Sequence, residues 1–367
     1  MRAETLPVTV VIPAYRRPDM VERAVRSVLA QRRRPCEILV VDDASGDETG
    51  PRAAALGARV ITHEHNLGEG GARNTGIRAA GTDWVALLDC DDEWLPDHLD
   101  TLWSARDGHV LVGTAVLGTG SEPDHHRVYG WRGRRPRVLS SPAEVALPET
   151  KVSSSTSMVR RAVVLDAGGF RPLKRAADLD LWIRVLEHGS AVAIPRVTAL
   201  YHMHPGQVSD DAPAMHRSHK HVLDAYRDRP WCTPALLRRH EGVVAWDSAR
   251  GELQAGRRRA PTLARLAARL AHPQRAIGVA QLLVGRFQGR RLAARVAPGG
   301  GPSVALLPGA PGAVALGAAV VDLRDRGTLR AFLHLARCPT GQALASSRTQ
   351  ALALRVLSIE PLREPPT

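Results

Sequence analysis

Apolar runs alternate with amphipathic stretches along the first part of this chain. Short aliphatic or β-branched runs are typical of buried strands, and they occur at 8–12, 37–41, 59–62 and 84–88. Between these runs, apolar residues recur at helical spacing over 19–31, 47–56 and 72–80, with a glycine-rich loop over 66–71. Because strand and helix alternate, the pattern predicts an α/β fold with a mostly parallel sheet flanked by helices.

The pattern becomes mixed after about residue 110. It predicts strands at 110–117, 153–160, 191–194 and 197–201, and a helix at 180–188. Beyond 212 the chain is helical and basic, with amphipathic stretches near 234–255, 262–271 and 275–296. We therefore predict a domain over 1–211, a basic helical region over 212–297, a linker or loop over 298–313, and a partly helical segment over 314–367.

The net charge of +13 belongs mainly to the C-terminal part, because no acidic residue occurs between Leu253 and Val321. This region, 253–296 above all, is compatible with peripheral contact with an anionic membrane, with an acidic partner, or with arginines that are simply solvated. No nucleic acid is expected, since aromatic residues are almost absent there. The four cysteines lack CxxC spacing, so neither a zinc site nor a disulfide framework is indicated.

Neither a signal-peptide layout nor an uninterrupted apolar stretch of the ~18 residues needed to span a bilayer is seen. We therefore expect a cytoplasmic protein that is at most peripheral at the inner face of the plasma membrane.

Polar residues cluster where the predicted strands end, at 13–16, 42–45 and 89–92. Ligands of open α/β sheets bind at the carboxyl ends of strands. Asp89, Asp91 and Asp92 follow the fourth run directly, and carboxylates this close repel each other unless a cation lies among them. Oxygen ligands suit Mg²⁺ or Mn²⁺, which indicates a metal-bound phosphate ester. The alternative is an acidic helix N-cap after a strand.

Five motifs in order resemble those of the family-2 inverting glycosyltransferases, which have the GT-A fold. They are Val10–Tyr15, Val40–Ser45, Asn66–Gly76, Leu88–Asp92, and Gly168–Phe170 followed by Asp178–Arg184. The resemblance covers roughly residues 7–210. It implies a nucleotide-binding half over about 1–110 and an acceptor half over 111–211.

The resemblance assigns the nucleotide to the first strand ends. Pro13, Ala14 and Tyr15 would line the nucleoside, and Asp43 would accept a hydrogen bond from the base. Turn and helix-cap chemistry is the alternative for Asp42 and Asp43. Arg73 would lie near the donor phosphates, and an ordinary surface arginine is its alternative.

The resemblance assigns the metal, Mn²⁺ or Mg²⁺, to Asp91, Asp92 and His204, with Asp89 beside them in contact with the nucleotide. His204 belongs to a Tyr-His-Met-His element in which His202 replaces the family's arginine. A surface histidine is the alternative for His204.

Asp178 falls where the family has its general base, although Ala177 replaces the usual glutamate before it. Asp180 is the other candidate, and it also fits a helix-capping role.

These residues predict a metal-dependent inverting glycosyltransferase. The sugar would pass from a UDP-, dTDP- or GDP-sugar to an acceptor hydroxyl in cell-surface glycan, glycolipid or secondary-metabolite glycosylation. Two alternatives are a sugar-phosphate nucleotidyltransferase and a non-catalytic binding module that docks an anionic membrane or an acidic partner.

Overall fold

The computed structural model describes residues 5–120, 128–147, 150–204, 207, 212–241, 313–316 and 319–322. The main sheet is built from β1 (Leu6–Ala14), β2 (Pro35–Asp42), β3 (Arg59–Thr62), β4 (Trp84–Leu87), β5 (Glu93–Trp94), β6 (Leu111–Thr119), β7 (Val128–Tyr129), β8 (Arg137–Leu139), β9 (Ser157–Arg160) and β10 (Ala191–His202). The helices around it are α1 (Pro18–Leu29), α2 (Thr49–Ala55), α3 (Gly68–Ala79), α4 (His98–Ser104), α5 (Pro142–Val145), α6 (Arg161–Asp166), α7 (Ala177–Val185) and α8 (Ala212–Asp224).

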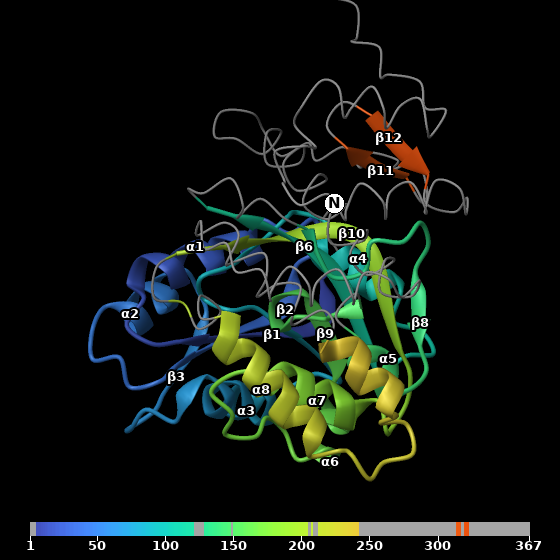
Figure 1. Ribbon diagram of the computed structural model, residues 1–367. Helices are drawn as coiled ribbons and strands as arrows, with labels where there is room; N and C mark the ends of the chain where they lie inside the picture. Colours follow the sequence, from blue (N-terminus) through green and yellow to red (C-terminus); the bar gives the residue numbers. More distant parts are fainter. Residues whose placement is uncertain are drawn as a thin grey trace, which may run out of the picture. The chain divides into compact units, whose positions relative to one another are not determined.

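The ten strands form one sheet of order β3-β2-β1-β4-β9-β6-β10-β5, with β7 paired to β6 and β8 to β10 (Figure 1). Strands β3, β2, β1 and β4 are parallel, as are β6 and β10. The predicted α/β fold with a mostly parallel sheet flanked by helices is therefore confirmed. The four predicted N-terminal strands and the helices between them are present.

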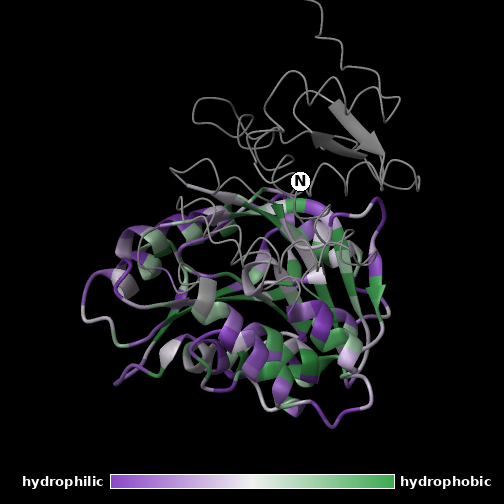
Figure 2. Cartoon of the chain, viewed as in Figure 1, coloured by the Kyte–Doolittle hydropathy of each residue, from purple (hydrophilic) through white to green (hydrophobic). Residues whose placement is uncertain are grey.

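Alternate residues of the central strands enter two different cores. Val10 and Ile12 pack with α1 and α4, whereas Val11 packs with α3 and α7. This is the period-two alternation of a strand that is covered on both faces. Figure 2 shows hydrophilic residues mainly on the helices and loops around the sheet. The sheet is thus held rigidly between two helix layers, and its strand ends are fixed in space.

The helix α3 begins at Gly68, inside the predicted glycine-rich loop. Both oxygens of Asp43 accept backbone N–H groups here, from Leu67 at 2.8 Å and from Gly68 at 2.8 Å. Gly68 has φ +76°, a conformation that glycine adopts readily. A carboxylate from the end of β2 therefore caps this helix, which a local sequence pattern does not reveal.

The second half of the sheet differs in detail from the predicted strands. β9 begins only at Ser157, because Ser154–Thr156 form a 3₁₀ turn in which the Ser157 hydroxyl donates to the Ser154 carbonyl at 2.7 Å. The two strands predicted at 191–194 and 197–201 are one strand, β10. Its register against β6 shifts between Ile194 and Val197, where Pro195 has no N–H for the ladder.

The chain divides into two compact units, of which the first contains the main sheet and continues to Leu237. This unit passes the predicted boundary at 211, because Val222 and Leu223 of α8 are buried in the same core as α7. The second unit contains an antiparallel pair, β11 (Ala313–Leu316) and β12 (Ala319–Asp322). The predicted boundary at 297/298, the basic stretches at 262–271 and 275–296 and the end of 234–255 lie outside the described residues. Among the helices that are described, none has both the length and the apolar character that crossing a bilayer requires.

Candidate functional site

The strand register brings the predicted polar clusters to one edge of the sheet. Ala14 pairs with Asp42 on one side of β1, and Val11 pairs with Leu87 on the other. Backbone hydrogen bonding continues past the first of these pairs, since the N–H of Asp43 donates to the Ala14 carbonyl at 2.9 Å. Because these strands are parallel, the residues after each of them lie together at the carboxyl edge.

The end of β1 forms a fixed turn with one exposed aromatic face. Tyr15 is 41% exposed, and the Arg16 guanidinium lies 5.1 Å from the centre of its ring. The Arg16 N–H donates to the Ser45 hydroxyl at 2.8 Å, and both Arg16 and Ala44 have positive φ, at 52° and 64°. Two non-glycine residues in this strained region mark a turn that tertiary contacts hold in place. An exposed ring on a rigid turn is suited to stacking on a planar ligand.

Asp42 and Asp43 have different roles. Asp42 accepts the Ser45 N–H at 3.1 Å, which is the turn chemistry considered for this pair. Asp43 is 2% exposed, caps α3 and contacts the His63 ring at 2.7 Å through Oδ1. Each carboxylate oxygen has two lone pairs, so Oδ2, which bonds only Gly68 among the described residues, keeps capacity for a further donor. Recognition of a base by Asp43 stays a prediction.

Arg73 is only 5% exposed, so the alternative of an ordinary surface arginine is wrong. Its guanidinium donates to Asp89 at 2.6 Å and also to Glu69, one turn before it on α3. Burial opposes the charge, but the carboxylates of Asp89 and Glu69 outweigh it and raise the pKa of Arg73. The arginine therefore stays charged, and it joins α3 to the loop after β4.

Glu69 lies within reach of several negative charges. Its side chain is half exposed, and the Arg73 charge lowers its pKa. Burial and the carboxylates of Asp89, Asp91 and Asp178 act the other way and raise that pKa overall. Arg73 is in direct contact with both Asp89 and Glu69. The charge of Asp178 also raises the pKa of Arg73.

The predicted metal residues are not equivalent. The Asp91 carboxylate lies 3.1 Å from Nε2 of His204, so His204 belongs to the acidic cluster and is not a free surface histidine. Asp92 is 1% exposed; its oxygens accept the Ser155 hydroxyl at 2.5 Å and the His202 N–H at 3.2 Å. Burial, followed by the charges of Asp91 and Asp89, raises the pKa of Asp92 well above its usual range.

This donor set fits a divalent cation only in part. No group of three or more His, Cys, Asp or Glu side chains arranged around a common metal position occurs in the described part of the chain. Asp91 and His204 supply one oxygen and one nitrogen ligand, and phosphate oxygens of a substrate commonly complete such a site. Asp92 fits less well than Asp91 as a direct ligand, because it is 1% exposed and each of its oxygens already accepts one hydrogen bond, from Ser155 or from the backbone of His202; its place in the metal site stays a prediction.

His202 replaces the family's arginine, and both nitrogens of its ring contact protein side chains. Its Nε2 lies 2.5 Å from Glu93, and its Nδ1 lies 3.0 Å from the Thr119 hydroxyl. The imidazole lowers the pKa of Glu93 against the opposing effect of burial. Both ring nitrogens therefore have protein partners, which argues against a phosphate contact from this residue.

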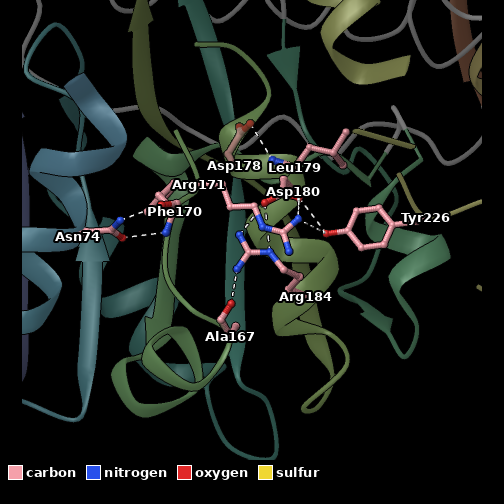
Figure 3. A network of polar contacts seen from close by, with 9 residues as sticks. All are labelled: Asn74, Ala167, Phe170, Arg171, Asp178, Leu179, Asp180, Arg184 and Tyr226. Carbon is pink, nitrogen blue, oxygen red and sulfur yellow. Dashed lines mark hydrogen bonds and ion pairs between the residues drawn. The ribbon is translucent and has the colours of Figure 1, made fainter. Parts of the chain in front are cut away.

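Asp178 and Asp180 both lie in the first turn of α7, but only Asp178 is accessible. The Asp180 carboxylate is 2% exposed and accepts from Arg171, Arg184 and Tyr226 (Figure 3). Asp178 is half-buried and accepts the N–H of Leu179 at 2.8 Å. Asp180 therefore has neither of the roles considered for it, general base or helix cap.

Sequence reasoning missed four residues of this region: Glu69, Asn74, Ser155 and Tyr226. Asn74 donates to the Phe170 carbonyl at 2.8 Å and accepts the Phe170 N–H at 2.7 Å. The only signal for Asn74 and Glu69 was their position in the same motif as Arg73. Ser155 and Tyr226 gave none, because their partners lie 63 and 46 residues away along the chain.

Comparisons with known proteins show which family and fold the chain resembles. Residues 9–165 match the family model of glycosyl transferase family 2. The succinoglycan biosynthesis protein ExoO of Rhizobium meliloti (strain 1021) is 37% identical over 145 residues, 39% of this chain and 39% of ExoO. The UDP-Glc:alpha-D-GlcNAc-diphosphoundecaprenol beta-1,3-glucosyltransferase WfaP of Escherichia coli is 28% identical over 214 residues, 55% of this chain and 79% of WfaP. The chain thus matches well under half the length of ExoO.

Among solved structures, the mannosyltransferase PcManGT from Pyrobaculum calidifontis has a TM-score of 0.50 with 17% identity. The likeness covers 79% of this chain and 87% of that chain, and it shows a shared GT-A fold.

Proposed function

Residues 9–165 belong to glycosyl transferase family 2, and from this premise we propose that the chain transfers a sugar from a nucleotide-diphosphate sugar to an acceptor hydroxyl, with inversion at the anomeric carbon. The observation that carries the proposal is the polar cluster at the carboxyl edge of the sheet, in which the buried Arg73 donates to Asp89 at 2.6 Å and Asp91 lies 3.1 Å from Nε2 of His204. The Phe170 ring, 5.1 Å from the Arg73 guanidinium, belongs to the segment that leads into α7 and Asp178. In-line displacement needs a base and a diphosphate site close to one another.

The nucleoside would lie on the turn after β1. The exposed face of Tyr15 would stack on the base, while Pro13 and Ala14 form the floor beside it. Asp43 would accept from the base through the spare capacity of Oδ2, and its bonds to α3 fix its direction. Asp89 would border the ribose or the diphosphate.

Mn²⁺ or Mg²⁺ would be held by Asp91 and His204, with Asp92 bracing the loop through Ser155. The cation would act as a Lewis acid that stabilises the negative charge of the departing nucleoside diphosphate. PcManGT is described in complex with GDP-Man and Mn²⁺, which supports both the donor class and the cation. The replacement of an arginine by His202 removes one positive charge that could otherwise share this task.

In the transfer itself, Asp178 would take the proton of the acceptor hydroxyl. The hydroxyl oxygen forms its bond to the anomeric carbon as the bond from that carbon to the diphosphate oxygen breaks. The backbone N–H of Leu179 donates to the Asp178 carboxylate at 2.8 Å and holds one of its oxygens in place. Arg73 donates to Asp89 and Glu69 through one guanidinium nitrogen and would hold the acidic loop and set the local charge, while its buried Nε has no hydrogen-bond partner in the described part of the chain.

The acceptor would belong to a cell-surface polysaccharide or its lipid-linked precursor. ExoO is a succinoglycan biosynthesis protein, and WfaP by its description acts on a diphosphoundecaprenol-linked sugar. Both concern bacterial glycans, which favours a glycan hydroxyl over a small secondary metabolite. Contact of residues 253–296 with an anionic membrane would suit such an acceptor.

The decisive experiment is donor turnover by the full chain. Release of UDP, dTDP or GDP is measured from a panel of nucleotide sugars, with Mn²⁺, with Mg²⁺ and with chelator, and with short glycan acceptors. The proposal expects release that requires the cation, falls about 1,000-fold in Asp178→Asn and is unchanged in Asp107→Asn, an exposed carboxylate remote from the motifs. Nucleotide binding without turnover across the panel would instead support a binding module, and nucleoside triphosphate consumption would support a nucleotidyltransferase.

A further inference from the structure

The first turn of α7 carries Asp178 but lacks the usual means of holding a helix start. Its N-cap, Ala176, makes no side-chain hydrogen bond to the helix and has φ 59°. An alanine in this left-handed region is strained, and an uncapped first turn frays unless other contacts hold it. The direction of the Asp178 carboxylate therefore depends on contacts made elsewhere in the turn.

Those contacts converge on Asp180. Its Oδ1 accepts from the Tyr226 hydroxyl at 2.8 Å and from Arg171 at 3.1 Å, and its Oδ2 accepts from Arg184 at 2.6 and 3.1 Å. Arg184 also donates to the carbonyl of Ala167. All the donors belong to other turns or segments, so this buried carboxylate ties the first turn of α7 to the rest of the acceptor half (Figure 3).

Anchoring Asp180 fixes Asp178 because of helix geometry. Residues two apart on an α-helix differ by about 200° in direction, so one of the pair points inward while the other points away. Figure 3 shows this, with Asp178 directed away from the Asp180 cluster. A rotation of the turn that released Asp180 would swing Asp178 from the region it shares with Glu69 and Arg73.

Tyr226 is the member of the cluster that comes from beyond residue 211, the predicted end of the first domain. It follows α8, is 6% exposed and packs against the Trp231 ring at a centroid distance of 5.6 Å. Burial and the neighbouring Asp180 raise the pKa of Tyr226 to about 12, so the hydroxyl keeps its proton and can donate at neutral pH.

Resting on the proposed role of Asp178 as base, we infer that Tyr226 is a positioning residue, which acts through Asp180 to aim Asp178 at the acceptor hydroxyl. The segment around α8 is then part of the catalytic half and not an appended region. Arg171 supports it on the same oxygen, and as its side chain is 52% exposed it can be changed with little effect on packing.

The test compares Tyr226→Phe and Arg171→Met with Lys220→Gln, a control on exposed α8 surface. Turnover of the active donor is expected to fall tenfold or more in both test variants at saturating acceptor, because small misplacements of a base cost about 100-fold. Donor KM and calorimetric nucleoside diphosphate affinity should stay within about twofold, since neither residue touches the donor side. A purely structural role would lower turnover, nucleoside diphosphate affinity and the thermal midpoint together.

A second readout does not depend on activity. Amide hydrogen exchange over residues 176–182 is expected to be at least tenfold faster in Tyr226→Phe than in Lys220→Gln, with exchange in β1 and β4 unchanged. Unchanged exchange over 176–182, or full turnover in Tyr226→Phe while Asp178→Asn is inactive, overturns the inference alone. Full turnover in Asp178→Asn would instead overturn the proposed function, and the exchange result would still decide whether Tyr226 orders the turn.

Discussion

The guanidinium of Arg73 donates to Asp89 at 2.6 Å and lies 5.1 Å from the centre of the Phe170 ring. This one side chain therefore joins the loop after β4 to the block before α7. Under the proposed function, those two segments would serve the donor and the acceptor, respectively. The charge of the buried Arg73 guanidinium therefore acts on both segments.

Arg73→Met should lower the free energy of unfolding by about 3 kcal/mol, because it leaves the partly buried Asp89 without its charged partner. Arg78→Met, on an exposed position of the same helix, should change it by less than about 0.5 kcal/mol. Urea denaturation followed by circular dichroism measures both. Equal stability of the two variants would contradict the structural role of the Arg73–Asp89 pair.

Asp91→Ala and His204→Ala should each weaken Mn²⁺ affinity by more than about tenfold when measured calorimetrically in the presence of UDP. Asp92→Asn should leave that affinity within about threefold, since the oxygens of Asp92 are bonded to Ser155 and His202. If Asp92→Asn abolishes metal binding while Asp91→Ala keeps it, the assignment of ligands is wrong.

The raised pKa of Asp92 makes stability depend on pH in a defined direction. The folded protein holds this proton more tightly than the unfolded chain, whose aspartates titrate near about 3.9. The free energy of unfolding should therefore fall as pH rises from about 4 through the raised pKa.

Asp92→Asn should flatten this decline, because an amide keeps an oxygen for the His202 N–H and can donate to the Ser155 hydroxyl. Denaturation in chelator at a series of pH values compares the two proteins. The same slope in both would show that Asp92 does not cause the pH dependence.

Asn74→Ala should cost about 2 kcal/mol of unfolding free energy, because the N–H and carbonyl of Phe170 lose their partner together. Asn74→Asp should cost a similar amount, since a carboxylate can accept the N–H but repels the carbonyl. Thermal unfolding of the two variants beside Arg78→Ala gives the comparison. A neutral Asn74→Asp would mean that the carbonyl finds another donor.

The sequence alone predicts those features of the fold that depend on residues close together along the chain. The strands end at Ala14, Asp42 and Leu87, within two residues of the ends of the predicted apolar runs, and parallel pairing then places Asp43 and Asp89 at one edge. It was insufficient where a partner comes from far along the chain. The burial of Arg73 depends on Asp89, and the hydrogen bonding of the Asp180 carboxylate depends on Tyr226, 46 residues later.

The β-structure differs from the prediction at two places, and each difference has its own physical cause. Pro195 breaks the apolar run between 191 and 201, so periodicity predicts two strands, yet pairing with β6 continues on both sides of it. The serine and threonine residues at 154–157 have ordinary strand spacing, but the hydroxyls of Thr156 and Ser157 bond to nearby backbone and tighten the chain into a turn. The continuity of β10 therefore depends on a neighbouring strand, whereas the turn before β9 depends on local side-chain hydrogen bonds.

The position of β9 has a consequence for how the protein is made. β9 pairs antiparallel with β4 on one side and with β6 on the other, although it is synthesised long after β4. At about 5 to 20 residues per second, the ribosome needs roughly 4 to 14 seconds to pass from Leu87 to Ser157. During that interval β4 presents an unpaired edge, the feature through which nascent chains join one another. Chains truncated before Ser157 should therefore aggregate, whereas those that extend past Arg160 close the sheet from within.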